Sequence, residues 1–294
     1  MLLATFSLGF GPLAKACIVP DTIPFARTEY NNIIVPVVLN GQDTVRLMFH
    51  SAFTGIALTR EGLQRCTSIR IDGEGTAESW AGSASSSVSL HNMIRIGRQT
   101  WDSVMVTIDE QSGPGSDGKF GYDLFADRVL EIDHDRQVMV VHPDPPDASA
   151  GYTPIPLIAS EGSLYIAASI MMKDSVHTDR FMLHTGYGGT AILGTAFRAR
   201  LGADVTLDTL GVKKLTDSFG NVLRNVTTRT PAITIGDQVF RDVRIQVMDP
   251  RSRFAANVLG GDLLKRFNCV IDLRNKRLSL KPNGLLNASF SERF

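Results

Sequence analysis

One stretch of the chain decides the fold: Val45-Arg46-Leu47-Met48-Phe49-His50-Ser51-Ala52. The same pattern returns at Asp179-Arg180-Phe181-Met182-Leu183-His184-Thr185-Gly186. In both copies an apolar run leads into a histidine, then a hydroxyl residue, then a small residue. Small residues, a threonine and more apolar residues follow each triplet. These continuations are Phe53-Thr54-Gly55-Ile56-Ala57-Leu58 and Tyr187-Gly188-Gly189-Thr190-Ala191-Ile192-Leu193.

The repeat extends well beyond the two histidines. Three further pairs of segments match at one offset of 139 positions: Ile96-Gly97-x-Gln99-x-Trp101 with Ile235-Gly236-x-Gln238-x-Phe240, Gly121-x-Asp123-Leu124 with Gly260-x-Asp262-Leu263, and Ile132-Asp133 with Ile271-Asp272. Ordered matches at a fixed offset are the mark of a duplicated structural unit. We therefore predict two copies of one lobe, at residues 28–143 and 152–282.

Each copy has the pattern of an all-β lobe. Short apolar runs at regular spacing, separated by turn residues, are typical of a barrel or sandwich. The Gly-x-Asp-Leu segments predict turns into short helices, with Asp123 and Asp262 as N-caps that accept a helix N–H. Asp133 and Asp272 precede basic residues, and we interpret them as hairpin-turn residues.

These features resemble the aspartic peptidases, either bilobed and pepsin-like or as tandem retropepsin-like domains of bacteria. The resemblance covers nearly the whole chain and implies two pseudo-symmetric β-barrel lobes with a cleft between them. In that family an apolar-apolar-Gly segment crosses each active-site loop. Val258-Leu259-Gly260 fits this pattern, whereas Lys119-Phe120-Gly121 has a lysine in place of an apolar residue.

The triplets depart from the family's Asp-Thr/Ser-Gly at its first position. Two catalytic aspartates of the family share a proton and activate a water between them. The resemblance places His50 and His184 at those positions, so the conventional carboxylate chemistry is not expected. Whether the protein is an enzyme is left open by the sequence.

Two hypotheses follow for the histidine pair. Neutral imidazoles could hold a water between a donor and an acceptor nitrogen, and repulsion between charged rings would lower at least one pKa below about 6.5. The protein would then be a hydrolase-like enzyme with a general acid/base pair, acting on a peptide or glycan polymer. The alternative is a pseudo-peptidase whose cleft binds a peptide or another ligand without catalysis.

The resemblance also suggests roles for the loop neighbours. The hydroxyls of Ser51 and Thr185, with Gly186, would brace the two loops against each other. Ala52 replaces the first glycine of the family, and its Cβ restricts the backbone. Phe53 and Tyr187 are bulky for this loop and would pack beneath the cleft floor or narrow it.

A β-hairpin flap covers the cleft in the family. The Gly- and Ser-rich segment 72–83 is the matching hairpin, and its Trp80 would cover a ligand or anchor the hairpin. In the second lobe, residues 216–222 form the corresponding hairpin around Phe219. We therefore predict that Trp80, Phe219 and Tyr187 contact the ligand, a peptide or polysaccharide.

No cofactor is predicted. A catalytic zinc usually has three protein ligands, and only two histidines are placed together. The remaining histidines show no metal-binding spacing: His91, His134, His142 and His177. A metal held by His50 and His184 stays an alternative, because neutral imidazole is a common ligand.

Composition narrows the classes of partner. The 294 residues contain 30 Lys and Arg and 30 Asp and Glu, which gives a net charge of zero. The sequence contains no basic tract of the kind that would predict nucleic-acid binding. No segment after residue 20 is long and apolar enough to span a membrane.

The first 16 residues are apolar and end in Ala14-Lys15-Ala16, which is similar to the end of a secretory signal. We therefore expect export to the periplasm or the outside of the cell. Three cysteines cannot all pair within one chain. Cys17 could form a disulfide with Cys66 after export, whereas Cys269 lies in an apolar strand and is interpreted as a buried thiol.

Overall fold

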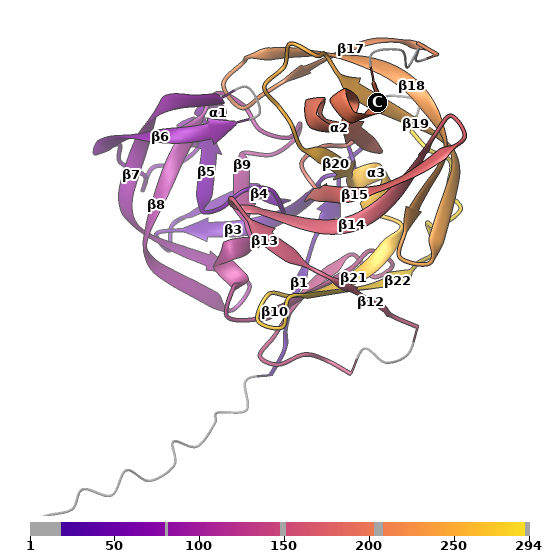
Figure 1. Cartoon of the computed structure of the whole chain (residues 1–294). Coiled ribbons are helices and arrows are strands. Elements are labelled where there is room, and N and C mark those ends of the chain that lie inside the picture. The colour runs from indigo at the N-terminus through magenta and orange to yellow at the C-terminus, as the bar shows by residue number, and fades with distance from the viewer. Residues whose placement is uncertain (1–18, 80–81, 148–150, 203–207, 292–294) are drawn as a thin grey trace, which may run out of the picture.

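A computed structural model of the chain describes residues 19–79, 82–147, 151–202 and 208–291. The predicted export signal at 1–16, Cys17 and the flap residue Trp80 lie outside this part of the chain. Strands dominate the described residues, and they form three sheets (Figure 1). The prediction of an all-β fold is confirmed.

The first eight-stranded sheet contains the first histidine loop. Its strands lie in the order β2 (Ala26–Arg27), β3 (Ile33–Leu39), β4 (Asp43–His50), β9 (Gly118–Gly121), β5 (Ile56–Thr59), β8 (Gln99–Asp109), β7 (Gly82–Ile96) and β6 (Gly73–Ser79). An additional pairing of β3 with β7 curls this sheet toward a closed barrel. The first half of β4 alternates buried and exposed residues, because successive side chains of a strand point to opposite faces. The end of β4 and the whole of β5 and β9 are buried.

The second eight-stranded sheet repeats this topology strand for strand. Its order is β13 (Ile158–Ser160), β14 (Ser163–Met172), β15 (Ser175–His184), β20 (Asn257–Gly260), β16 (Ala191–Leu193), β19 (Gln238–Met248), β18 (Val222–Ile235) and β17 (Gly211–Thr216). Here β14 also pairs with β18, as β3 does with β7. The repeat seen in the sequence is therefore a repeat of topology, and the two sheets lie on opposite sides of the molecule (Figure 1).

A six-stranded sheet joins the two halves. Its order is β1 (Asp21–Pro24), β11 (Val138–His142), β10 (Val129–Asp133), β21 (Phe267–Asp272), β22 (Arg277–Pro282) and β12 (Thr153–Pro156). The halves meet where β10 pairs with β21, with Leu130 opposite Ile271. Since this sheet mixes strands of both halves, the lobe limits 28–143 and 152–282 stay a prediction.

The described helices are short: α1 (Arg60–Gln64), the 3-10 turn η1 (Tyr122–Phe125), α2 (Thr195–Leu201) and α3 (Gly261–Leu264). None of the described helices has the length and apolar character needed to cross a membrane. The Gly-x-Asp-Leu segments do begin short helical turns, as predicted.

The N-cap role predicted for Asp123 and Asp262 is wrong. Gly121 and Gly260 occupy the cap positions, and neither helix has a side-chain cap bond. The aspartates lie two positions beyond the cap residue, inside the first turn, and so cannot cap the helix. Asp123 instead accepts the backbone N–H of Gly55 in the first histidine loop, at 2.9 Å.

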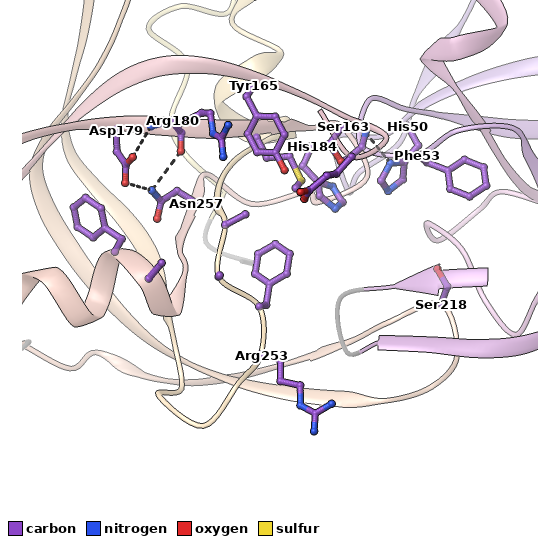
Figure 2. Close-up of a pocket in the computed structure, with 18 of the residues that line it drawn as sticks. His50, Phe53, Ser163, Tyr165, Asp179, Arg180, His184, Ser218, Arg253 and Asn257 are labelled. Carbon is purple, nitrogen blue, oxygen red and sulfur yellow. Dashed lines mark hydrogen bonds between the residues drawn. The ribbon is translucent and has the colours of Figure 1, made fainter. Parts of the chain in front are cut away.

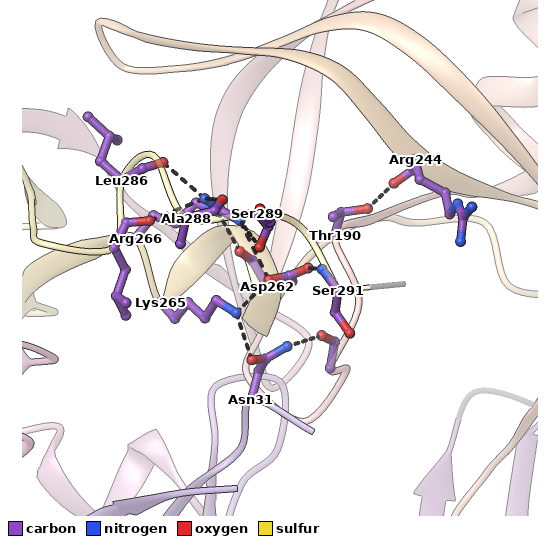
Figure 3. A network of polar contacts seen from close by, with 12 residues as sticks. Asn31, Thr190, Arg244, Asp262, Lys265, Arg266, Leu286, Ala288, Ser289 and Ser291 are labelled. Atoms are coloured by element: carbon purple, nitrogen blue, oxygen red, sulfur yellow. Dashed lines mark hydrogen bonds and ion pairs between the residues drawn. The ribbon is translucent and has the colours of Figure 1, made fainter. Parts of the chain in front are cut away.

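The carboxylate of Asp262 is the centre of a polar network that includes the end of the described chain and a residue of the first half (Figure 3). It is fully buried, lies 2.7 Å from Lys265 Nζ and accepts the backbone N–H of Ser291 at 2.8 Å. The same Lys265 ammonium donates to Asn31 Oδ1 of the first half at 2.9 Å. Arg266 extends the network, since its buried guanidinium packs over the Phe290 ring, 4.0 Å from the centroid.

The hairpin-turn interpretation of Asp133 and Asp272 agrees with the structure. Asp133 Oδ1 accepts the backbone N–H of Arg136 at 2.9 Å, and Asp272 Oδ1 accepts that of Asn275 at 3.0 Å. Both are local side-chain to backbone bonds of the kind that favours aspartate in turns.

Among the described cysteines, Cys66 and Cys269 are free thiols. Burial raises the pKa of the Cys269 thiol to about 12 and that of Cys66 to about 11. Neither thiol is therefore activated as a nucleophile. A disulfide between Cys66 and Cys17 stays a prediction.

Candidate functional site

Each histidine stands at the end of a strand that is crossed by a glycine-ending segment. Strand β4 ends at His50 and pairs in parallel with β9, so that His50 lies opposite Gly121. Strand β15 ends at His184 and pairs in parallel with β20, which places His184 opposite Gly260. The chain leaves the sheet directly after each histidine, and the two loops meet between the lobes.

Reciprocal hydrogen bonds brace the two loops. Thr185 Oγ1 accepts the backbone N–H of Ser51 at 3.0 Å, and Ser51 Oγ accepts that of Thr185 at 3.1 Å. Each hydroxyl then donates across the interface, Ser51 to the carbonyl of Leu183 at 2.8 Å and Thr185 to that of Phe49 at 2.7 Å. The four bonds fix the loops, and with them the histidines, relative to each other.

The two imidazole rings are in direct contact. Their centroids are 4.5 Å apart and the ring planes meet at 61°. His50 is 8% exposed and His184 only 2%. The pairing of His50 with His184 that the repeat predicted is therefore found in the structure, as an edge-on contact in which His50 is the more accessible ring.

The protonation of each ring is set by its own loop. Nδ1 of His50 accepts the backbone N–H of Ala52 at 3.2 Å, and Nδ1 of His184 accepts that of Tyr187 at 2.9 Å. An imidazole nitrogen that accepts a hydrogen bond carries no proton. A neutral ring has one donor and one acceptor nitrogen, so the proton of each ring lies on Nε2.

Both rings are held neutral. Burial lowers the pKa of His50 well below 6.5, and the neighbouring charges of His184 and Lys119 add to this effect. Burial also lowers the pKa of His184 to about 3, again with a contribution from the Lys119 ammonium. Desolvation and nearby positive charge both disfavour an imidazolium.

Gly186 makes room for the first ring. A Cβ at this position would overlap Cδ2 and Nε2 of His50. The equivalent residue of the first loop is Ala52, which is half-buried and has no positive φ. The glycine predicted to brace the loop is thus required by the His50 ring, and the alanine is accommodated without left-handed backbone.

Lys119 is a site residue that sequence reasoning treated only as a departure from the family pattern. Its Nζ lies 2.7 Å from Asp109 Oδ2, donates to Ser218 Oγ at 2.8 Å, and stands 4.5 Å from the centroid of the Phe53 ring. The lysine is 5% exposed. A charged residue inside an otherwise apolar strand motif was the signal that could have revealed it.

Two cavities adjoin the histidine pair, of about 660 Å³ and about 270 Å³. Four residues line both of them: His50, His184, Lys119 and Ser218. We call this group the junction. The junction forms a wall common to the smaller cavity and to the larger one, most of whose lining residues are drawn in Figure 2.

The larger cavity has aromatic and charged walls, of which the sequence analysis had identified only Phe53. Its aromatic side chains are Phe53, Tyr165, Phe197 and Phe254. Arg180 stacks on Tyr165 with 4.9 Å between the guanidinium carbon and the ring centroid. Asp179 pairs with Arg200 and accepts from Asn257 Nδ2 at 2.8 Å (Figure 2).

Of the three residues predicted to contact the ligand, the structure places only Tyr187 at a cavity. Strands β6 and β7 form the predicted flap hairpin, whose Trp80 lies outside the described residues. Tyr187 is buried and lines the smaller cavity. Phe219 is half-buried in the second-lobe turn and lines neither cavity, whereas its neighbour Ser218 lines both.

The second-lobe hairpin is attached to the first lobe. The carbonyl of Ser218 accepts the backbone N–H of Glu110 at 3.0 Å, and that of Asp217 accepts Gln111 Nε2 at 2.6 Å. Together with the bond from Lys119, these contacts fix one wall of the junction. The sequence placed the hairpin but not its partner, because contacts between lobes are not encoded in local patterns.

The described residues contain no group of three or more His, Cys, Asp or Glu side chains that could hold a metal ion. His134 is buried apart from the cleft, against Phe25, with ring centroids 5.6 Å apart, and burial lowers its pKa to about 3. His142 pairs with Glu131 at 2.7 Å on the sheet that joins the halves.

The structure is similar to the crystal structure of the aspartic proteinase from Irpex lacteus, with a TM-score of 0.59 and 15% sequence identity. The match covers 93% of this chain and 100% of that chain. No protein-family model matches the sequence, and neither does any curated protein. At this identity the likeness establishes the fold, and the chain has the aspartic-proteinase fold that its sequence predicted.

Proposed function

We propose that the protein is a non-catalytic peptide-binding protein built on the aspartic-proteinase fold. One observation carries the proposal: Nδ1 of both His50 and His184 accepts a backbone N–H of its own loop. The lone pair that would take up a proton is directed at that loop. Each ring therefore carries its proton on Nε2.

General base catalysis fits this arrangement poorly. A general base must reach the proton that it removes and has a pKa near the working pH. Burial lowers the pKa of His184 to about 3 and that of His50 well below 6.5. An imidazole with its proton on Nε2, as in His50, is better suited to donate a hydrogen bond to a carbonyl or carboxylate oxygen.

The hydrolase-like alternative keeps one observation in its favour. The two rings are in contact at the place where the cavities join, and paired titratable groups in a cleft are often functional. In this alternative at least one ring would have to rotate so that its unprotonated nitrogen faces the cleft, which breaks its bond to the backbone N–H of Ala52 or Tyr187.

A peptide is the preferred ligand class. A structure of similar fold is a proteinase, and the larger cavity offers apolar and aromatic walls that suit amino-acid side chains. With the apolar segment at residues 1–16, we also propose that the protein is exported and meets its ligand outside the cytoplasm.

Glutamine substitution separates binding from catalysis. A glutamine can donate a hydrogen bond but cannot exchange a proton. The double variant His50→Gln, His184→Gln should retain peptides from a random octapeptide library as well as the unsubstituted protein does. Neither protein should cleave that library between pH 3 and pH 8, as followed by mass spectrometry. Cleavage by the unsubstituted protein that the double variant lacks would support the hydrolase-like alternative instead.

A further inference from the structure

Nitrogen-bearing side chains make up most of the junction. Of the four residues that line both cavities, three are His50, His184 and Lys119, and the fourth is Ser218. No carboxylate belongs to this group. In the aspartic peptidases that the sequence resembles, the corresponding position carries two carboxylates. The centre of the cleft therefore carries nitrogen side chains in place of carboxylates, and the only charged side chain of the junction, Lys119, is paired with Asp109.

Three carboxylates line the cavities outside the junction: Asp179, Asp217 and Glu161. Asp179 pairs with Arg200 and accepts from Asn257 at the side of the larger cavity. Asp217 accepts the backbone N–H groups of Phe219 and Asn221 within its own turn, at 3.0 and 2.8 Å. None of the three belongs to the junction, whose lining side chains are His50, His184, Lys119 and Ser218.

Lys119 retains donor capacity toward the cavities. A lysine ammonium has three N–H donors. Among the described residues, two of them are directed at Asp109 Oδ2 and Ser218 Oγ. The third donor can serve a ligand oxygen in the two cavities, which His50 also lines. A charged donor binds a carboxylate more strongly than it binds a neutral carbonyl.

We propose that the junction binds a carboxylate group of the peptide ligand, through Lys119 Nζ and His50 Nε2. This inference rests on the proposed peptide-binding function and adds to it the chemistry of the recognised group. The carboxylate can belong to the C-terminus of the peptide or to an aspartate or glutamate side chain. The remainder of the ligand lies in the larger cavity, against Phe53 and Tyr165.

Three sets of octapeptides test the proposal by calorimetry at pH 7. The first set is neutral in its side chains with a free C-terminus, the second is amidated and contains one Asp or Glu, and the third is amidated and neutral. At least one carboxylate-bearing set should bind about tenfold or more tightly than the third, which is the gain expected from one charged hydrogen bond. The carboxylate-bearing set that binds more tightly identifies whether the carboxylate comes from the C-terminus or from a side chain.

Substitution of Lys119 provides the second arm. Lys119→Met alone would leave Asp109 buried without its cation, so it is combined with Asp109→Asn. This pair should lose the preference for carboxylates and retain binding of the neutral set, while Lys119→Arg should keep the preference. Lys173→Met, at an exposed turn, is the matched control and should change nothing.

The results distinguish the two proposals. Equal binding of all three peptide sets, or an unchanged preference in the Lys119→Met, Asp109→Asn variant, would overturn the carboxylate inference and leave peptide binding intact. Failure of all three sets to bind the unsubstituted protein would overturn the peptide-binding proposal itself.

Discussion

Ser51 and Thr185 exchange hydrogen bonds across the interface between the lobes, each hydroxyl accepting the backbone N–H of the other, at 3.0 and 3.1 Å. Both side chains are buried. Their bonds make the two histidine loops a single rigid unit, so the contact between His50 and His184 depends on this pair. The loop-bracing role that the family resemblance implied has a direct geometric basis here.

Removal of one hydroxyl should lower the stability of the whole protein. Thr185→Val deletes the acceptor for Ser51 N–H and leaves that buried donor unsatisfied, which costs about 1–3 kcal/mol of unfolding free energy. Urea denaturation measures the difference. Ser85→Ala, at an exposed position, is the control and should be neutral. If Thr185→Val is as stable as this control, the bracing bonds do not hold the lobes together.

A methyl group at Gly186 should be destabilising because it collides with the His50 ring. Overpacking of this kind costs about 1–3 kcal/mol. In the double variant Gly186→Ala, His50→Ala the ring is absent, so the added cost of the methyl group should largely disappear. Gly211→Ala serves as the control, since no atom lies within 4 Å of a Cβ there. Equal costs of Gly186→Ala with and without the His50 ring would show that the contact is not what excludes a side chain.

The lowered pKa of His184 predicts how stability changes with pH. The folded protein resists protonation of this ring down to about pH 3, whereas the unfolded chain takes up the proton near 6.5. Because the unfolded state then binds more protons, unfolding becomes easier as pH falls from 7 to 5, by about 2 kcal/mol for this residue. Urea titrations at the two pH values should show a smaller loss in His184→Gln. An equal loss in both proteins would mean that this histidine titrates normally in the folded state.

The stability of the Asp262 network should depend on the negative charge of the Asp262 carboxylate. Asp262→Asn leaves the ammonium of Lys265 and the guanidinium of Arg266 without their buried anion, which costs about 3–5 kcal/mol. Adding Lys265→Met to this variant removes one of the two uncompensated charges and should recover part of the loss. Thermal or urea denaturation of the three proteins tests this, and a double variant less stable than Asp262→Asn alone would contradict it.

Much of the architecture could be predicted from the repeat, because a duplicated pattern of strand, loop and Gly-ending segment specifies the same topology twice. The histidine pair and the bracing hydroxyls were accessible for the same reason. The N-cap assignment failed because each helix begins two residues earlier than the assignment assumed, which changes which atoms the carboxylate reaches. Lys119 and Ser218 were missed as site residues, since one interrupts an apolar strand and the other acts only through contact between lobes.

The direction of the imidazole nitrogens could not be predicted either. The sequence allowed a donor from one ring and an acceptor from the other, as a water-activating pair requires. The backbone N–H groups of Ala52 and Tyr187 remove that choice, because each occupies the acceptor nitrogen of its own histidine. This local geometry, more than the identity of the residues, favours binding over catalysis.

The protonation of His50 and His184 is the most direct test of this account. Nitrogen-15 NMR of the imidazole rings at pH 7, with assignments confirmed by His50→Gln and His184→Gln, distinguishes a protonated nitrogen from an unprotonated one. We predict that both rings are neutral, with the proton on Nε2 and a bare, hydrogen-bonded Nδ1. A ring protonated on Nδ1, or an imidazolium in the pair at this pH, would contradict the account.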